Sequence, residues 1–296
     1  MSHQDNNYNL DLKPPSPEIL QWAKENIGED PETRNEVISK LRNIIFERQE
    51  CTPHRTDDVF LLRFLRSCKF DPEATHSLIV EYYNFKKNNP QFFVNVNLEK
   101  LTGLLTDGVI STPPYYEGSG RRMVIHRMGK WDPEKYSLDE VYQFNIAIME
   151  MGILEPQGQI LGSIAIFDFE DYSLQQAWYF TPSYAYKSIQ ILTKAFPMKV
   201  HAIHIVNESY IFDIIFNVVK PFLSTSVLEK IFFHGSDLES LHKHIAPEYL
   251  PPRYGGTRPQ HSIENWISIW RNNQVVFQEL KDLGYEFSEN EDANDV

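Results

Sequence analysis

The sequence is poor in cysteine, in long apolar runs and in positive charge, and each shortage excludes a class of protein. Only two cysteines occur in 296 residues, Cys51 and Cys68, so a disulfide framework is excluded and a reducing compartment is favoured. No apolar run reaches the length of about eighteen residues that a membrane-spanning helix needs. The first residues are polar and proline-rich, unlike a secretory signal. We therefore expect a cytoplasmic protein.

The charge balance is acidic, with 28 lysines and arginines against 41 aspartates and glutamates and a formal net charge of −13. A chain of this charge repels the phosphates of nucleic acids, so nucleic-acid binding is not expected. Part of the acidic excess lies in residues 286–296, which contain no basic side chain. This segment is expected to form a solvated, mobile tail.

The N-terminal third of the chain shows the apolar periodicity of amphipathic helices. Ser16 and Asp71 each precede a proline and are suited to helix starts, because their side chains can accept hydrogen bonds from first-turn N–H groups. Two further helices are predicted around residues 37–45 and 60–68. This part of the chain is expected to form a small helical bundle.

From about residue 95 the pattern changes to strands that alternate with helices. Strands are predicted at 123–128, 163–169, 199–206 and 231–233. Helix starts are predicted from capping boxes and N-cap residues at Ser137 with Glu140, Thr181, Ser236 with Glu239, and Ser262. This alternation predicts an α/β fold with a mostly parallel sheet.

Patterns for phosphate or metal chemistry are weak in this sequence. Gly118 and Gly120 could belong to a phosphate-binding loop, but they precede a strand, and such a loop must lie at a helix N-terminus. A plain turn is expected there. His201 and His204 are three apart on a strand, so they point to opposite faces and cannot share a metal ion. No metal site and no cofactor are expected.

Acidic residues at the end of the strand 163–169 keep an acid–base function open, because Asp168 and Glu170 would share a sheet face. Alternatively, this strand end accepts hydrogen bonds from neighbouring loops. No nucleophile motif such as GxSxG accompanies the carboxylates. We favour the second interpretation and expect no enzymatic activity.

The segment 210–223 is apolar nearly all round when it is read as a helix. Its polar stripe consists of Asp213, Asn217 and Lys220. Such a helix needs burial on most of its circumference. It is either a core helix or a lid that contacts a ligand on one side and a membrane on the other, and periodicity alone leaves both interpretations open.

Several separated motifs resemble those of one known family. The motifs are DDVFLLRFLR at 57–66 with FD at 70–71, IFDFE at 166–170, FPMKV at 196–200, IHIVNE at 203–208, KPFL at 220–223 and LPPRYGG at 250–256. Over residues 16–275 the chain resembles the CRAL-TRIO lipid-transfer family. It is most similar to the branch of alpha-tocopherol transfer protein, cellular retinaldehyde-binding protein and the clavesins.

The resemblance implies a helical N-terminal domain and an α/β domain whose sheet floors a hydrophobic cavity closed by a gate helix. It makes 209–223 the gate. The expected parts are a flexible N-terminus at 1–15, a helical domain at 16–92, a lipid-binding domain at 95–260, a C-terminal helix at 261–285 and an acidic tail at 286–296.

The same resemblance implies which residues line the cavity. From the body of the domain they are Val109, His126, Met128, Tyr142, Asn145, Ile146, Met149, Phe167, Ile191, Leu192, Phe196 and Ile203. From the gate they are Phe212, Ile215, Phe216, Val219 and Phe222.

The implied function is binding and transfer of a small hydrophobic lipid, tocopherol-, retinoid- or carotenoid-like, with membrane-coupled gate opening. Burial contributes about 0.8 kcal/mol per methylene, so roughly ten buried methylenes give near-micromolar affinity. Tyr142, Asn145 and His126 are candidates to pair a polar end of the lipid. The tocopherol carrier has small hydroxyl side chains where this chain has Asn145 and Met149, which changes the polarity and volume of the pocket.

This branch also binds phosphoinositide head groups through a basic cluster beside the gate. Lys199, His201 and Lys230 stand at matching positions here, whereas Cys68 and Ser226 replace basic residues. Fewer converging cations predict weaker or altered phosphoinositide binding. We expect peripheral and transient membrane association.

Two other functions stay open on the sequence. One is a lipid-sensing, phosphoinositide-binding trafficking adaptor that docks through the acidic tail or the helical bundle. The other is an enzyme built around Asp168, Glu170 and His126. Lipid bound to the purified protein would distinguish a carrier from an enzyme, and failure to deliver that lipid would favour the adaptor.

Overall fold

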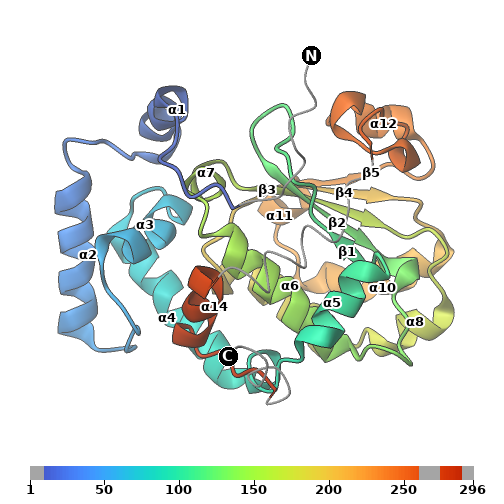
Figure 1. The fold of residues 1–296 in the computed structure, drawn as a ribbon, viewed down its shortest axis with the longest axis horizontal. Helices are drawn as coiled ribbons and strands as arrows, with labels where there is room; N and C mark the ends of the chain where they lie inside the picture. Colours follow the sequence, from blue (N-terminus) through green and yellow to red (C-terminus); the bar gives the residue numbers. More distant parts are fainter. Residues whose placement is uncertain (1–9, 260–273, 289–296) are drawn as a thin grey trace.

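The computed structural model describes residues 10–259 and 274–288. The N-terminal region consists of the helices α1 (Pro17–Ile27), α2 (Arg34–Arg48), α3 (Asp58–Ser67) and α4 (Pro72–Asn88). Ser16 and Asp71 cap α1 and α4 as predicted, because their side chains accept hydrogen bonds from first-turn backbone N–H groups. The helices predicted for this region are therefore confirmed (Figure 1).

A five-stranded sheet forms the centre of the α/β region. Its strands are β1 (Ile110–Ser111), β2 (Arg122–Arg127), β3 (Ser163–Asp168), β4 (Val200–Val206) and β5 (Ile231–Phe233), in that spatial order. Every neighbouring pair is parallel except β1 with β2, which is antiparallel. The α/β class with a mostly parallel sheet is confirmed. Gly120 lies in the predicted turn before β2, where its N–H donates to Glu117 O at 2.8 Å.

The remaining helices pack around this sheet. They are α5 (Leu98–Thr106), α6 (Leu138–Gly152), α7 (Pro156–Leu161), α8 (Leu174–Tyr179), α9 (Pro182–Gln190), α10 (Tyr210–Val219), α11 (Thr225–Leu228), α12 (Leu238–His242) and α14 (Gln274–Asp282). A π-helical turn at Ile191–Ala195 extends α9, and short 3₁₀ turns occur at Pro90–Phe92, Met128–Lys130, Lys220–Phe222, Pro247–Tyr249 and Pro252–Tyr254.

Two expectations about helix ends need correction or qualification. The capping box at Ser236 was wrong, because the Asp237 side chain accepts a hydrogen bond from Ser240 N at 3.1 Å and begins α12 one residue later. The box of Ser137 with Glu140 is confirmed at α6. The start expected at Ser262 lies outside the described residues, and α14 falls within the expected helix at 261–285.

The first residues of the segment expected to be a mobile tail are bonded to the helical region, which corrects that expectation for residues 286–288. Glu286 N donates to Phe93 O at 2.8 Å, and Val96 N donates to Glu286 O at 2.8 Å, so this residue is fixed to the helical region. Residues 289–296 lie outside the described part. Within the described ranges, no helix has both the length and the apolar character that crossing a bilayer demands.

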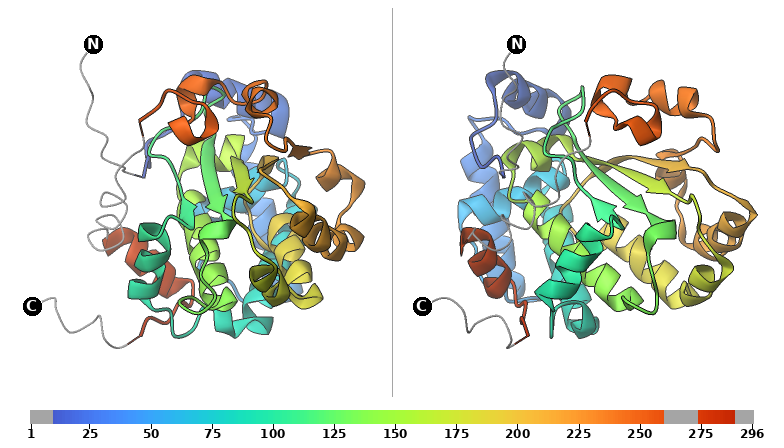
Figure 2. Two further views of the ribbon diagram at one scale, coloured as in Figure 1. Left: turned by 90° about the vertical axis from the view of Figure 1, so that its right-hand side faces the viewer. Right: turned by 45° about the vertical axis from the view of Figure 1, so that its right-hand side comes forward.

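The two faces of the sheet are covered by different parts of the chain. The first, which we call the sealed face, packs against the segment that contains α12 (Figure 2). Its residues are Met123, Ile125, Ile164, Ile166, Ala202 and Val206, and their partners are Leu241, Ile245, Leu250 and Tyr254. The second, which we call the open face, lies towards α10 and carries Val124, His126, Ala165, Phe167, Ile203 and Ile205.

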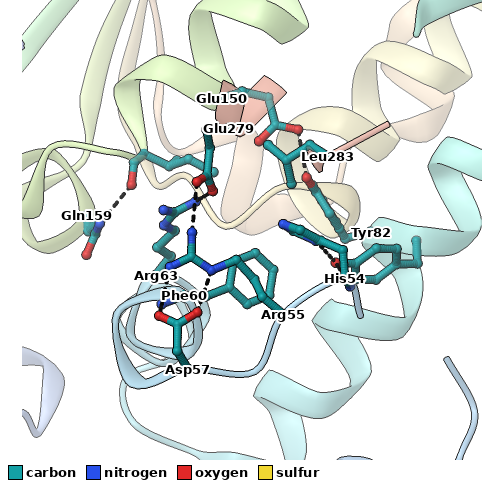
Figure 3. Close-up of polar contacts among 12 residues, drawn as sticks. His54, Arg55, Asp57, Phe60, Arg63, Tyr82, Glu150, Gln159, Glu279 and Leu283 are labelled. Atoms are coloured by element: carbon teal, nitrogen blue, oxygen red, sulfur yellow. Dashed lines mark hydrogen bonds and ion pairs between the residues drawn. The ribbon is translucent and has the colours of Figure 1, made fainter. Parts of the chain in front are cut away.

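Helix α14 fastens the end of the described chain to the helical region. Glu279 accepts hydrogen bonds from Arg63 Nη1 at 2.7 Å and from Arg55 Nη1 at 2.8 Å (Figure 3). Lys86 of α4 donates to Leu283 O at 3.0 Å. Burial lowers the pKa of the Lys86 ammonium. These contacts join segments that are far apart in the sequence.

Replacing Glu279 with alanine should lower the free energy of unfolding by about 2–4 kcal/mol, because Arg63 is left as a buried charge without its carboxylate. Urea unfolding followed by circular dichroism measures this change. Gln278→Ala is the matched control, since its amide bonds only to exposed Asp282 among the described residues and its effect should stay within about 0.5 kcal/mol. Equal urea midpoints for Glu279→Ala and the unaltered protein would contradict the anchoring role.

Candidate functional site

The open face keeps accessible apolar surface although it lies inside the fold. On the middle strand β3, Ile164 and Ile166 of the sealed face are 4% and 0% exposed. Ala165 and Phe167 of the open face, by contrast, are only partly buried. A close-packed core would bury both faces of a middle strand equally well. The packing over the open face is therefore incomplete.

Helix α10 lies over this face and is apolar on both of its sides. Phe212 and Ile215 are buried in one cluster with Ile203 and Ile205 of β4. On the outer side, Ile214 is 48% exposed. The predicted polar stripe is exposed, with its members at Asp213, Asn217 and Lys220. A helix with apolar residues both towards the sheet and towards solvent is unusual for a plain core helix.

The residues predicted to line a cavity fall into two clusters. The cluster on the open face contains Met128, Phe167, Leu192, Ile203, Phe212, Ile215, Phe216 and Val219. The cluster that continues into the N-terminal helices contains Val109, Tyr142, Ile146, Met149, Ile191 and Phe196. Phe222 is partly exposed after α10, and its ring centroid lies 5.7 Å from that of Tyr186.

Two members of the second cluster make firm contacts with neighbouring helices. The Tyr142 ring stacks on Phe92 with centroids 5.1 Å apart, and its hydroxyl donates to Tyr184 O at 3.0 Å. Phe196 meets Tyr82 edge-on with centroids 5.5 Å apart. These contacts hold the α/β region to the helical region. A lining role for Tyr142 and Phe196 stays a prediction.

His126 is an ionisable side chain in the middle of the open face. Its ring stacks on Phe167 with centroids 4.4 Å apart and an interplanar angle of 8°. Burial lowers the pKa of His126 to about 4, so the ring is neutral near pH 7. Asn145, the other polar candidate on α6, uses its Nδ2 to donate to Val141 O of its own helix at 3.0 Å.

Basic side chains gather at the amino ends of the parallel strands. Arg121, Lys199 and Lys230 immediately precede β2, β4 and β5. Burial, together with repulsion from Lys69 and Lys230, lowers the pKa of Lys199 to about 8. Burial and Arg121 likewise lower the pKa of His201. The structure thus brings the predicted trio of Lys199, His201 and Lys230 together and adds Arg121, which the sequence reasoning missed.

Asp168 is a buried acceptor rather than an available acid. Its Oδ1 accepts from Glu170 N at 3.0 Å and Asn207 Nδ2 at 2.9 Å, and its Oδ2 accepts from Arg253 Nε at 3.1 Å and Tyr254 OH at 3.0 Å. The interpretation that this strand end accepts hydrogen bonds from neighbouring loops is confirmed. The carboxylate fixes the segment around Tyr254 to the sheet.

A histidine cluster on the sealed side was not foreseen. His204 is buried and His201 exposed, as their spacing predicted. His204 Nδ1 lies 3.0 Å from His234 Nε2, and the His244 ring centroid lies 5.2 Å from that of His204. Burial lowers the pKa of His204 to about 3. Among the described residues, no group of three or more His, Cys, Asp or Glu side chains is arranged to hold a metal ion.

Large apolar side chains are exposed around α10. We call this surface the apolar rim, and its members are Leu174, Trp178, Tyr179, Tyr186, Tyr210, Ile214 and Phe222. They come from α8, α9, α10 and the turn after α10, and α10 contacts both α8 and α9 (Figure 1). Trp178 is 83% exposed. Single exposed apolar residues are common, but a group on adjoining elements marks an interaction surface.

Two surface cavities lie away from the open face, and the first of them borders the apolar rim at Tyr186. One, of about 360 Å³, lies between α4 and α9 and is lined by polar residues such as Asn84 and Lys187. The other, of about 460 Å³, lies at the carboxyl ends of β3 and β4 beside Asp171 and Glu208. Neither is lined by the residues predicted for the lipid cavity, which stays a prediction.

Comparison with protein families identifies both halves of the fold. Residues 106–256 match the CRAL/TRIO domain. The chain belongs to the CRAL-TRIO family. Residues 30–101 match a domain described as Pinta-like, UBA domain. CRAL-TRIO proteins bind hydrophobic ligands and are generally non-enzymatic.

Relatives cover most of this CRAL-TRIO chain. The alpha-tocopherol transfer protein-like protein of Homo sapiens is 33% identical over 252 residues, which are 85% of this chain and 74% of that protein. Clavesin-1 of Rattus norvegicus is 31% identical over 253 residues, 85% of this chain and 72% of the relative. The crystal structure of Sfh5 covers 84% of this chain and 99% of its own at 13% identity and a TM-score of 0.51, which supports the fold alone. The resemblance seen in the motifs is confirmed.

Replacing Asp168 with alanine should lower the free energy of unfolding by about 2–4 kcal/mol, because the buried hydroxyl of Tyr254 and the partly buried amide of Asn207 lose their acceptor. Chemical denaturation monitored by tryptophan fluorescence measures the loss. Glu170→Ala is the control, since it removes an exposed ion pair to Arg253 that is worth about 1 kcal/mol or less. A normal midpoint for Asp168→Ala would show that the sealed face is held by apolar packing alone.

Proposed function

We propose that this protein binds one small, mostly apolar lipid between the open face and α10 and transfers it between intracellular membranes. The observation that carries the proposal is the partial accessibility of Ala165 and Phe167 on the middle strand beneath an apolar helix. A lipid seated there would bury the surface that the protein's own side chains leave accessible, contributing about 0.8 kcal/mol per methylene. Kinship with alpha-tocopherol transfer protein-like proteins and clavesins supports the same function.

Helix α10 is the proposed gate. Phe216 and Val219 are partly buried beside the open face, whereas Ile214 points to solvent. Opening such a helix in water would expose apolar surface on its inner side as well. At a membrane surface both sides find an apolar environment, so opening costs less there. Gate opening, and with it lipid exchange, is therefore coupled to membrane contact.

The apolar rim extends the membrane-contacting surface beyond the gate. Trp178 and Tyr179 of α8 and Tyr186 of α9 are aromatic residues, which favour the boundary between head groups and acyl chains. The rim is continuous with α10, because Phe222 contacts the Tyr186 ring. Insertion of the rim would place the gate at the depth where a lipid can leave directly into the bilayer.

The basic cluster is the proposed contact for phosphoinositide head groups. The formal net charge of −13 opposes general binding to anionic membranes, so a local cluster must supply the attraction. Lys199 and Lys230 are joined by Lys69, which follows Cys68 in the sequence, and by Arg121, so the cluster keeps positive charge although Cys68 and Ser226 replace basic residues of this branch.

The gate is tested with Ile214→Asp, which places a charge on the outer side of α10. Transfer of a fluorescent tocopherol from the protein to liposomes should slow by about tenfold, corresponding to ~1.4 kcal/mol lost at the membrane surface. Equilibrium binding of the same probe should be unchanged. Phe46→Asp on α2, where the side chain is 59% exposed, is the matched control and should transfer normally.

An unchanged transfer rate for Ile214→Asp would mean that the lipid leaves by another route. A protein that binds the probe but delivers none of it to liposomes would instead favour a lipid-sensing adaptor.

The basic cluster is tested with the double variant Lys199→Gln and Lys230→Gln on vesicles that contain phosphatidylinositol bisphosphate. Loss of about 1 kcal/mol per lysine should weaken binding roughly thirtyfold. The pKa of Lys199 is about 8, so its charge is present below that pH and lost above it. Binding by the unaltered protein should therefore weaken as the pH rises from 7 to 9.

Lys243→Gln, which replaces an exposed lysine next to α12, should bind these vesicles normally. Equal binding of the unaltered protein to phosphatidylserine vesicles of the same charge density would contradict recognition of the inositol phosphates.

A further inference from the structure

His126 is a buried polar side chain that the protein itself does not pair. It is 8% exposed, and its sheet neighbours are Ile110 on β1 and Phe167 on β3, both apolar. No hydrogen bond joins its ring to any residue that the structure describes, whereas buried His204 and His234 are bonded to each other at 3.0 Å. Burying an imidazole without a hydrogen-bond partner costs free energy, unless a bound molecule supplies that partner.

Of the other two polar candidates, Tyr142 has its hydroxyl engaged and Asn145 is engaged through one N–H. The Tyr142 hydroxyl donates to Tyr184 O at 3.0 Å and also bonds with Ser188. The Asn145 amide nitrogen donates to Val141 O at 3.0 Å. His126 differs from both, because neither of its ring nitrogens is hydrogen-bonded to a residue that the structure describes.

We propose that His126 pairs the head group of the bound lipid and selects an uncharged lipid with a hydroxyl or carbonyl oxygen over a hydrocarbon or an ionised fatty acid. This inference rests on the proposed function. A neutral imidazole offers one N–H donor and one acceptor nitrogen. A hydroxyl group can accept a hydrogen bond from the N–H or donate one to the other nitrogen, whereas a carbonyl oxygen can only accept from the N–H. A pure hydrocarbon leaves both unpaired.

Discrimination against a carboxylate follows from the surroundings of the ring. Burial alone lowers the pKa of His126 to about 4, and no charged side chain contributes. The proposed lipid site beside His126 therefore supplies no cation for an ionised head group. Moving a carboxylate from water to such a place costs more than one hydrogen bond returns. The selectivity therefore has two sources, the hydrogen bond that an alcohol or carbonyl gains and the unpaired charge that a carboxylate would leave in the site.

The test is a competition assay with three matched chains, hexadecan-1-ol, hexadecanoic acid and hexadecane, against a fluorescent tocopherol at pH 7.4. For the unaltered protein, the alcohol should compete about tenfold more tightly than either the hydrocarbon or the acid. In His126→Phe the preference for alcohol over hydrocarbon should fall to about twofold or less, while hexadecane affinity is kept. His126→Gln, which retains a donor and an acceptor, should preserve the preference.

His54→Phe makes the same change at an exposed position of the helical region and should behave as the unaltered protein. The preference of the unaltered protein is measured without any variant, so a folding defect in His126→Phe leaves the test intact. Three results would each overturn the inference while the transfer function stands. They are equal competition by the alcohol and the hydrocarbon, tighter binding of the acid than of the alcohol, and a preference for alcohol over hydrocarbon that is retained in a folded His126→Phe. Failure of the unaltered protein to bind the probe or any of the three chains would overturn the proposed function itself.

Discussion

Hydrophobic burial on one face of the central sheet fixes the geometry on which the rest of the α/β region depends. The sealed face is closed by the segment around α12, and Asp168 ties that segment to the end of β3 through Arg253 and Tyr254. With one face closed, the strands are held in register without help from the other. The open face can then remain incompletely packed, as Ala165 and Phe167 show, without loss of the sheet.

Most protein cores are both apolar and closely packed. The space between the open face and α10 is apolar but not closely packed. Phe212 and Ile215 hold α10 to β4, while Ile214 on its other side remains exposed. In water this arrangement costs free energy, and in the proposed function a guest lipid inside and a membrane outside would relieve that cost. The acidic body and the few cations at the amino ends of the strands would then orient the proposed membrane contact.

Elements with local signals were predictable from the sequence, and those that depend on tertiary placement were not. Periodicity and capping located the strands β2 to β5 and the helices α1 to α4, because their burial and first-turn hydrogen bonds are set by nearby residues. β1 has two residues and no period to detect. The start of α12 moved by one residue because Asp237 is as good a cap as Ser236. In the site, motif position singled out α10 and the basic residues before β4 and β5, and their roles as gate and head-group contact stay predictions. The exposure of Trp178 on α8 and the contact of His204 with His234 depend on how α8, β4 and β5 pack in the folded protein, so no local pattern predicts them.

The location of a guest between the open face and α10 is tested most directly by a crystal structure of the protein loaded with a brominated long-chain alcohol. Anomalous scattering from bromine marks the lipid independently of the surrounding side chains. We expect a bromine peak in van der Waals contact with side chains of β3 and α10. Bromine found only on the outer surface, with Phe167 packed tightly against the gate, would contradict it.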